Sequence, residues 1–138
     1  MIDILVTTNP LDTQKCMDAI ADPAAGGSVM FTGTVRNQTK GKKVVTLEFE
    51  AYIPMAEKEM QKIAETVTKR WAALHVCIHH HVGVLEIGQI PVIIAVSSHH
   101  RQAAFEACQY AIDTLKETVP IWKKEVFEDG EVWVAAHP

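Results

Sequence analysis

The chain has 138 residues, a formal net charge of -4 with neutral histidines, and 48% hydrophobic residues. These values predict a single globular domain over residues 1–138 that needs no disulfide or structural metal to fold. The mild acidity argues against nucleic-acid binding, and no apolar stretch is long enough for a transmembrane helix. The N-terminus lacks the features of a signal peptide and the three cysteines are widely spaced, which favours a cytoplasmic protein.

The first half of the chain alternates predicted strands with a short helix. Residues 2–7 are predicted to form a strand, and a helix is expected from the Asn9-Pro10 pair to about Ile20, because asparagine caps helices and proline suits the first helical position. Residues 28–35 and 44–52 show the β-branched, aromatic and alternating patterns of strands. We expect these two strands to pair as a hairpin across the basic loop between them.

A second helix is predicted from Pro54 to about Trp71, where apolar side chains recur on one stripe. Two strands are expected next, at residues 74–84 and 91–99, and the second is apolar on both faces, which is typical of a central strand. A third helix is expected over residues 101–118. Two final strands, joined by a Glu-Asp-Gly turn, are expected at residues 121–127 and 131–136.

The order of these elements places runs of strands between helices. Such an order predicts an α+β domain with about three helices and a mixed or mainly antiparallel sheet. The apolar residues expected on the buried stripe of the third helix are Phe105, Cys108, Ile112, Leu115 and Val119.

Two segments carry candidate anion-binding residues. At the start of the third helix, free backbone N–H groups favour an anion, and Arg101 adds a forked donor that suits phosphate or carboxylate. His100 beside it adds an imidazole, a side chain of the type that moves protons near neutral pH. Helix capping and surface charge explain this pair equally well. Arg36 follows a predicted strand that Gly33 interrupts, and such a glycine usually marks a bulge or a close backbone approach.

A lysine-rich segment surrounds a Pro-Ile-Trp sequence near the C-terminus. Lys116 lies at the margin of the apolar stripe of the third helix, so its amine is either partly desolvated and reactive or part of a packed side chain paired with Asp113. The local pattern favours the second interpretation. Pro120 ends the helix and turns the chain back, and the following strand sends Lys123 and Lys124 to opposite faces.

Histidines and cysteines are the candidate metal ligands. His79 and His81 alternate on one predicted strand and share a face, where they could ligate one zinc, copper or nickel ion. Solvated or hydrogen-bonded histidines explain the same pattern, and we expect no bound metal. The three cysteines are expected to be small buried apolar residues; they are Cys16, Cys77 and Cys108.

Three blocks of the sequence are specific, and they occur in the order "FTGTVRN", "HRQAAFEA" and "LKETVPIWKKE". Together they resemble the catalytic (large) subunit of molybdopterin synthase, which adds sulfur in molybdenum cofactor biosynthesis, and the resemblance covers nearly the whole chain. It implies an α+β domain of the α/β-hammerhead kind that works as a homodimer. It also implies a heterotetramer in which each copy binds a small subunit with a ubiquitin-like fold.

The resemblance implies a reaction as well. The small subunit ends in Gly-Gly with a thiocarboxylate, whose sulfur is transferred to cyclic pyranopterin monophosphate (precursor Z) to form the dithiolene of molybdopterin. No cofactor is implied. The active-site positions of the family fall on Arg36, His100, Arg101, Lys116 and Lys123. Because the substrate phosphate and the partner's C-terminus are both anionic, a basic pocket on an acidic protein is expected.

The resemblance implies different roles within this set. Lys116 would be the principal catalytic residue, Lys123 would assist by charge or proton transfer, and the other three residues would hold anions. The family commonly carries an arginine near the C-terminus that reaches the neighbouring subunit's pocket. This chain has His137 there, so the contact is either absent or sensitive to pH.

Two other functions stay open at the level of sequence. A non-catalytic dimeric adaptor that captures a ubiquitin-like tail would need the anion-holding residues but not Lys116. A histidine-ligated metal hydrolase predicts stoichiometric metal in the purified protein.

Overall fold

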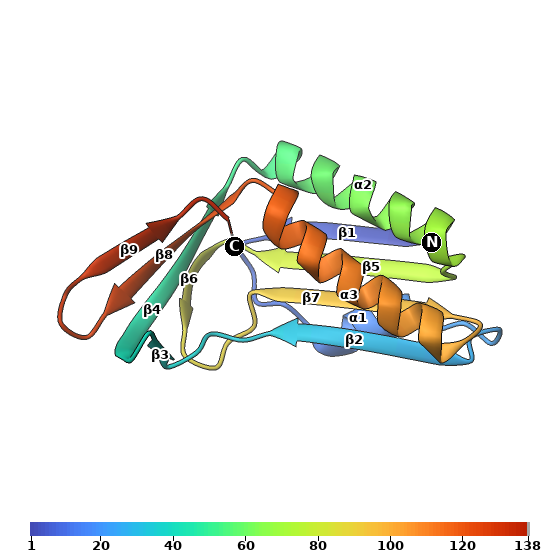
Figure 1. Cartoon of the computed structure of the whole chain (residues 1–138), viewed down its shortest axis with the longest axis horizontal. Helices are drawn as coiled ribbons and strands as arrows, with labels where there is room; N and C mark the ends of the chain where they lie inside the picture. The colour runs from blue at the N-terminus through green and yellow to red at the C-terminus, as the bar shows by residue number, and fades with distance from the viewer. Residues whose placement is uncertain (138) are drawn as a thin grey trace.

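The computed structural model describes residues 1–137 and arranges them as two sheets and three helices (Figure 1). The strands are β1 (Ile2–Thr7), β2 (Gly27–Gly33), β3 (Gln38–Thr39), β4 (Lys42–Ala51), β5 (His75–His81), β6 (Gly83–Glu86), β7 (Val92–Ser98), β8 (Ile121–Phe127) and β9 (Val132–Ala135). The helices are α1 (Thr13–Ala19), α2 (Ile53–Trp71) and α3 (Arg101–Thr118). The predicted α+β class is confirmed. Within the described residues, no helix is long and apolar enough to cross a membrane.

The first sheet has the strand order β1-β5-β7-β2. β1 and β5 run parallel, whereas β7 is antiparallel to both of its neighbours. α2 and α3 cover one face of this sheet and α1 lies against the other (Figure 1). β7 is buried along its whole length, which confirms the central position expected for a strand that is apolar on both faces.

The second sheet is built around β4 and extends beyond the helices, at the left of Figure 1. Its strand order is β3-β4-β8-β9, and β6 also pairs with β4. The predicted pairing of residues 28–35 with 44–52 is wrong, because β2 pairs with β7 in the first sheet. The chain changes sheets after β2, and a tight hairpin joins β3 to β4. The turn residues of this hairpin, Lys40 and Gly41, have φ values of 50° and 80°, as a two-residue hairpin turn requires.

α1 begins later than the sequence predicts. Its N-cap is Asp12, whose carboxylate accepts a hydrogen bond from the Lys15 N–H at 3.2 Å. The backbone N–H of Asn9 instead donates to the Thr7 hydroxyl at 3.0 Å. Asn9 therefore belongs to a turn that follows β1, and Asp12 caps the helix instead.

Two apolar residues break the pattern that their elements predict and are exposed. Val45 is 49% exposed because a register shift in the pairing of β4 with β8, between Val44 and Thr46, breaks the alternation of the strand. Phe105 is 61% exposed and lies beside Arg70 at the outer edge of α2 and α3. The other four residues of the predicted α3 stripe are buried.

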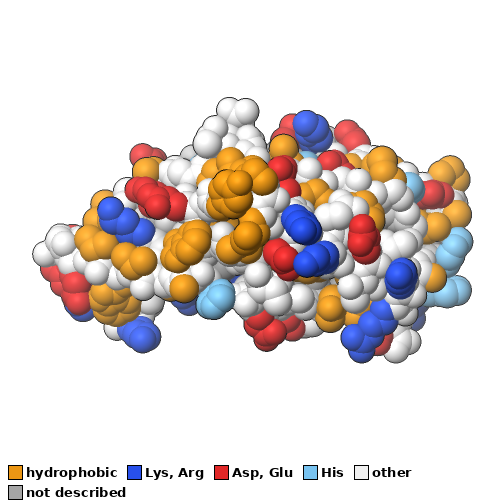
Figure 2. Space-filling model, turned by 90° about the horizontal axis from the view of Figure 1, so that it is seen from above, with side chains coloured by type: hydrophobic (Ala, Val, Ile, Leu, Met, Phe, Trp, Pro, Cys, Tyr) orange, Lys and Arg blue, Asp and Glu red, His pale blue; other side chains and the backbone are white. Residues whose placement is uncertain are grey.

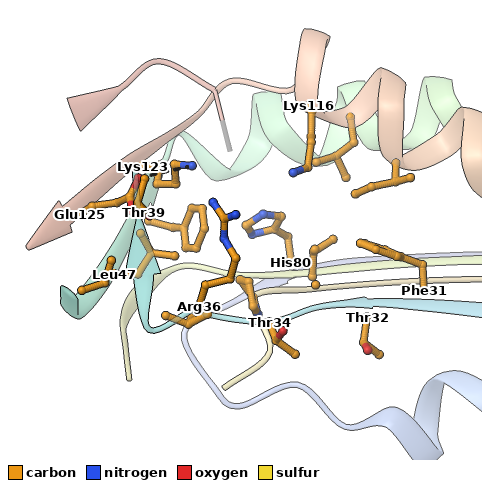
Figure 3. Close-up of a pocket in the computed structure, with 18 residues that line it drawn as sticks. Phe31, Thr32, Thr34, Arg36, Thr39, Leu47, His80, Lys116, Lys123 and Glu125 are labelled. Atoms are coloured by element: carbon orange, nitrogen blue, oxygen red, sulfur yellow. Dashed lines mark hydrogen bonds and ion pairs between the residues drawn. The ribbon is translucent and has the colours of Figure 1, made fainter. Parts of the chain in front are cut away.

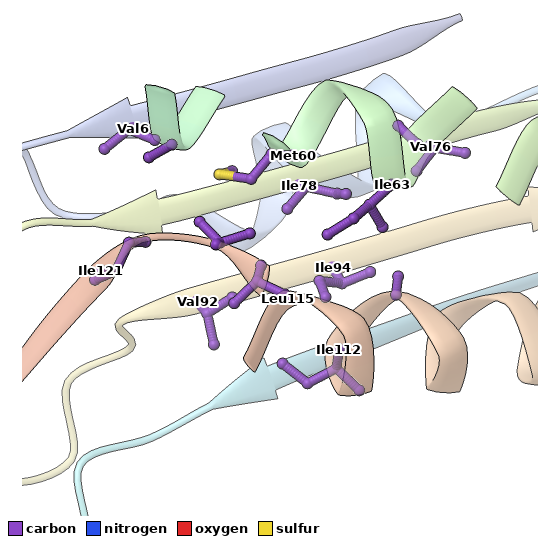
Figure 4. Packing of buried hydrophobic residues seen from close by; sticks show 14 of the residues in the cluster. Val6, Met60, Ile63, Val76, Ile78, Val92, Ile94, Ile112, Leu115 and Ile121 are labelled. Atoms are coloured by element: carbon purple, nitrogen blue, oxygen red, sulfur yellow. The ribbon is translucent and has the colours of Figure 1, made fainter. Parts of the chain in front are cut away.

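The main core lies between the first sheet and the α2–α3 pair (Figure 4). Leu115, in the last turn of α3, is 1% exposed, and Ile121, at the start of β8, is fully buried. The Val119 N–H donates to the Leu115 carbonyl at 3.1 Å, which closes the helix. Because the core holds both sides of the Val119-Pro120 turn, the direction of the neighbouring Lys116 and Lys123 side chains is set by packing.

Candidate active site

A cavity of about 480 Å³ opens where the first sheet meets the second, beside the C-terminal end of α3 (Figure 3). Its lining comes from β2 and the segment after it, from β3, β4, β5, β7 and β8, and from the last turns of α3. The apolar part of the lining includes Phe31, Leu47, Phe49, Val92 and Ile112. The charged and polar part includes Arg36, Thr39, His80, Lys116, Lys123 and Glu125.

Three cations from three distant segments point into this cavity. The side-chain nitrogens of Arg36, Lys116 and Lys123 extend toward a common space (Figure 3). Among residues 1–137, no carboxylate forms an ion pair with Arg36 or Lys116, whereas Lys123 Nζ lies 3.8 Å from Glu125 Oε1. The cavity therefore carries excess positive charge on a chain whose net charge is -4, and it favours an anionic ligand.

Glu125 holds one side of the cavity in place. Its Oε2 accepts a hydrogen bond of 2.7 Å from the Thr39 hydroxyl, and its side chain is 13% exposed. The alternation of β8 puts Lys123 on the same face, while Lys124 is exposed and borders a separate hollow with Trp122. The prediction that the two lysines point to opposite faces is confirmed.

Lys116 fits neither interpretation drawn from the local sequence. The residue is exposed and is not desolvated within this chain. It is not paired with Asp113, whose carboxylate accepts a hydrogen bond from Gln109 Nε2 at 3.1 Å. The Lys116 amine extends into the cavity instead (Figure 3).

His80 is a cavity residue that the sequence reasoning missed. It is 1% exposed, and its ring meets the Phe49 ring edge-on with centroids 5.1 Å apart. Burial lowers the pKa of His80 to about 4, so the imidazole is neutral near pH 7. Its Nδ1 lies 2.7 Å from the His81 carbonyl. Because a carbonyl only accepts, Nδ1 carries the proton and Nε2 is left as an acceptor. The sequence did contain a signal for this placement, because the alternation of β5 puts His80 on the opposite face from His79 and His81.

Gly33 borders the cavity through a close approach rather than a bulge. A Cβ atom added there would lie 2.7 Å from Val92 Cγ1, and the pairing of β2 with β7 continues in register through the glycine. The predicted bulge is therefore absent, and the close neighbour of Gly33 is the Val92 side chain rather than another backbone segment.

The remaining predicted site residues lie outside this cavity in the single chain. His100 and Arg101 are exposed at the N-terminal end of α3. Arg101 and Lys116 are fifteen positions apart on α3, a distance of about 22 Å at 1.5 Å per residue. His137 is also exposed, and within residues 1–137 His81 does not join His79 in a group of potential metal ligands.

Comparisons with known proteins agree with this structure. A family model described as "MoaE protein" matches residues 6–118. A molybdopterin synthase catalytic subunit from Staphylococcus carnosus is 48% identical over 94% of this chain and 86% of its own length, and one from Homo sapiens is 44% identical over 92% and 68%. The crystal structure of molybdopterin synthase from Staphylococcus aureus superposes with a TM-score of 0.90, at 43% identity and 96% coverage of both chains. The chain therefore belongs to the MoaE family.

Proposed function

We propose that residues 1–138 form one domain that acts as the catalytic subunit of a molybdopterin synthase. In this role the chain transfers sulfur from the C-terminal thiocarboxylate of a ubiquitin-like small subunit to cyclic pyranopterin monophosphate, which becomes molybdopterin. Relatives that are 44–48% identical to this chain over 127–129 aligned residues bear the name of that subunit. The observation that carries the proposal is the convergence of Arg36, Lys116 and Lys123 on one cavity.

The cavity suits the two anions of this reaction. Arg36 offers a planar fork of donors, which matches a substrate phosphate. Lys116 reaches the cavity from the end of a helix fixed by the core, and there it moves protons or engages the carbonyl of the partner's tail. Lys123, held near Glu125, assists by charge or proton transfer. The apolar wall that includes Phe31 and Leu47 excludes water from the reacting atoms.

A direct reconstitution tests this function. The purified chain is mixed with a thiocarboxylated small subunit and precursor Z, and molybdopterin is measured. Formation of molybdopterin that depends on both additions is the expected result. Binding of the small subunit without conversion would show an adaptor and would overturn the catalytic assignment.

The positions of His100 and Arg101 call for a second copy of the chain at each site. Both residues lie too far along α3 to reach the cavity of their own chain, so their role in anion binding requires a neighbour. The second sheet offers a surface for that neighbour, since hydrophobic side chains gather at its end of the molecule (Figure 2). Its exposed large hydrophobic residues include Val45, Val84, Trp122, Val132 and Val134. In such a dimer His137 would also act on the neighbour's site.

Mixed dimers test whether the site is shared between copies. We expect Arg101→Ala and Lys116→Ala chains each to be inactive alone. When the two are coexpressed in equal amounts, about half of the dimers are mixed and each mixed dimer has one intact site of two. The unseparated mixture should therefore recover about a quarter of wild-type activity, and the isolated mixed dimer about half. The readout is molybdopterin formation by the mixed dimer isolated with two different tags. No recovery in that dimer would place Arg101 outside the neighbour's site.

A further inference from the structure

Two cysteines and a histidine meet on the face of the first sheet that is turned away from the cavity. The alternation of β5 sends His80 into the cavity and sends Cys77 and His79 toward α1. Cys16 of α1 completes the group, with its Sγ 3.3 Å from His79 Nδ1. The three potential ligand atoms all lie within 4.8 Å of one another, and none of the three residues is more than 2% exposed.

We propose that Cys16, Cys77 and His79 bind one Zn²⁺ ion through two thiolates and the Nδ1 atom of the imidazole, with a water molecule as the fourth ligand. Zinc takes sulfur at about 2.3 Å and imidazole nitrogen at about 2.0–2.1 Å, so a tetrahedral angle places the sulfur and nitrogen ligands about 3.5 Å apart. The 3.3 Å between Cys16 Sγ and His79 Nδ1 is close to that spacing. Two thiolates also select a soft ion over Mg²⁺ or Ca²⁺.

Asp3 supplies the outer contact that a zinc-bound imidazole usually has. β1 runs beside β5 with Asp3 paired to Cys77, and Asp3 Oδ2 lies 3.3 Å from His79 Nε2. Within the described part of the chain, His79 Nε2 is a buried nitrogen that makes no hydrogen bond of good geometry. With the metal on Nδ1, the proton resides on Nε2 and a small rotation of the carboxylate lets it accept that proton in a hydrogen bond.

The charge of such a centre suits its surroundings. Zn²⁺ replaces the two thiol protons, which leave to solvent, so that one dication, two thiolates and a neutral imidazole sum to zero. Apart from Asp3, the neighbouring side chains on this face are mainly apolar and include Ile20, Ile93 and Ala95. A neutral centre avoids the cost of an uncompensated charge in such an environment.

Zinc at this position would fasten α1 to the sheet. α1 has seven residues, too few for a helix that is stable on its own. Because the ion binds a site that exists only when Cys16 lies against β5, it stabilises the folded chain by mass action. The site lies on the opposite face from the cavity, so its role is distinct from sulfur transfer.

Cobalt titration provides the test. The chain is purified with a reductant and a chelator, the chelator is removed, and Co²⁺ is added while thiolate-to-metal charge-transfer absorption and tetrahedral d–d bands are recorded. We expect saturation at one equivalent per chain and loss of the bands when Zn²⁺ is added. Cys77→Ser and His79→Gln should each abolish or strongly weaken the bands.

Cys108→Ser is the matched control. Cys108 is also buried, but it lies on α3, on the other side of the sheet, with its Sγ 3.7 Å from the Ile94 carbonyl. The Cys108→Ser chain should keep the full absorption, and Zn²⁺ should raise its thermal midpoint as in wild type but not that of Cys77→Ser. If Cys77→Ser does not fold, Cys16→Ser carries the same test. Absence of thiolate bands in excess Co²⁺, or bands that persist unchanged in Cys77→Ser, would overturn the proposal.

Discussion

Replacing Lys116 with alanine is expected to lower the rate of molybdopterin formation by about 10²–10⁴-fold, the usual contribution of a positioned acid or base. The Lys116 amine extends into the cavity from the last turn of α3 (Figure 3), and no carboxylate among residues 1–137 pairs with it. Its removal leaves the core untouched because Leu115, not Lys116, holds the helix end. The measurement is single-turnover conversion of precursor Z by saturating thiocarboxylated small subunit.

Two further variants separate chemistry from simple charge. Lys116→Arg keeps the positive charge, but a guanidinium stays protonated and lacks a nucleophilic amine, so we expect its rate to stay near that of Lys116→Ala. Lys124→Ala removes a neighbouring lysine that faces away from the cavity and should act within a few-fold of wild type. Full activity in Lys116→Arg would mean that Lys116 only binds anions and takes no part in the chemical step. Near-normal turnover by Lys116→Ala would remove it from catalysis altogether.

The sequence predicts an element well where its apolar pattern runs without interruption along the whole element. α2 and α3 carry continuous apolar stripes over 19 and 18 residues, and β7 is apolar on both faces, so each was identified close to its observed bounds. Strand pairing was not predictable in the same way. Nothing in the local pattern of β2 says that its partner is β7, more than fifty residues later in the chain, rather than the next strand. The hairpin prediction therefore failed, although both strands exist.

In the candidate site, too, local features could be predicted from the sequence and contacts between distant segments could not. Proline reversal and strand alternation were enough to place Lys123 near the end of α3 and Lys124 away from it. His80 was missed because its partners, Phe49 and the His81 carbonyl, matter only once β4 lies beside β5. The resemblance grouped Arg101 with Lys116, but it could not show that the length of α3 keeps the two apart within one chain.

Gly26→Ala is expected to lower the free energy of unfolding by about 3 kcal/mol, at the upper end of the usual cost of overpacking. A Cβ atom at this position would lie 2.1 Å from the backbone oxygen of His99 and 3.2 Å from its carbonyl carbon. Neither atom belongs to a side chain that can rotate away, so the start of β2 must separate from the β7–α3 turn. The hydrogen bond of 2.9 Å from the Gly26 N–H to the Ser98 carbonyl would be strained as well.

This substitution links stability to the proposed function, because the same turn presents His100 and Arg101. Urea unfolding at a fixed protein concentration measures the cost, and the activity of chains that remain folded should also fall. Gly41→Ala is the matched control: its added Cβ meets no atom within 4 Å, and only its φ of 80° opposes a side chain, so its cost should be about 1 kcal/mol. If Gly26→Ala is as stable as Gly41→Ala, the close contact does not fix this turn. If it is destabilised but fully active per folded chain, the geometry of His100 and Arg101 does not depend on Gly26.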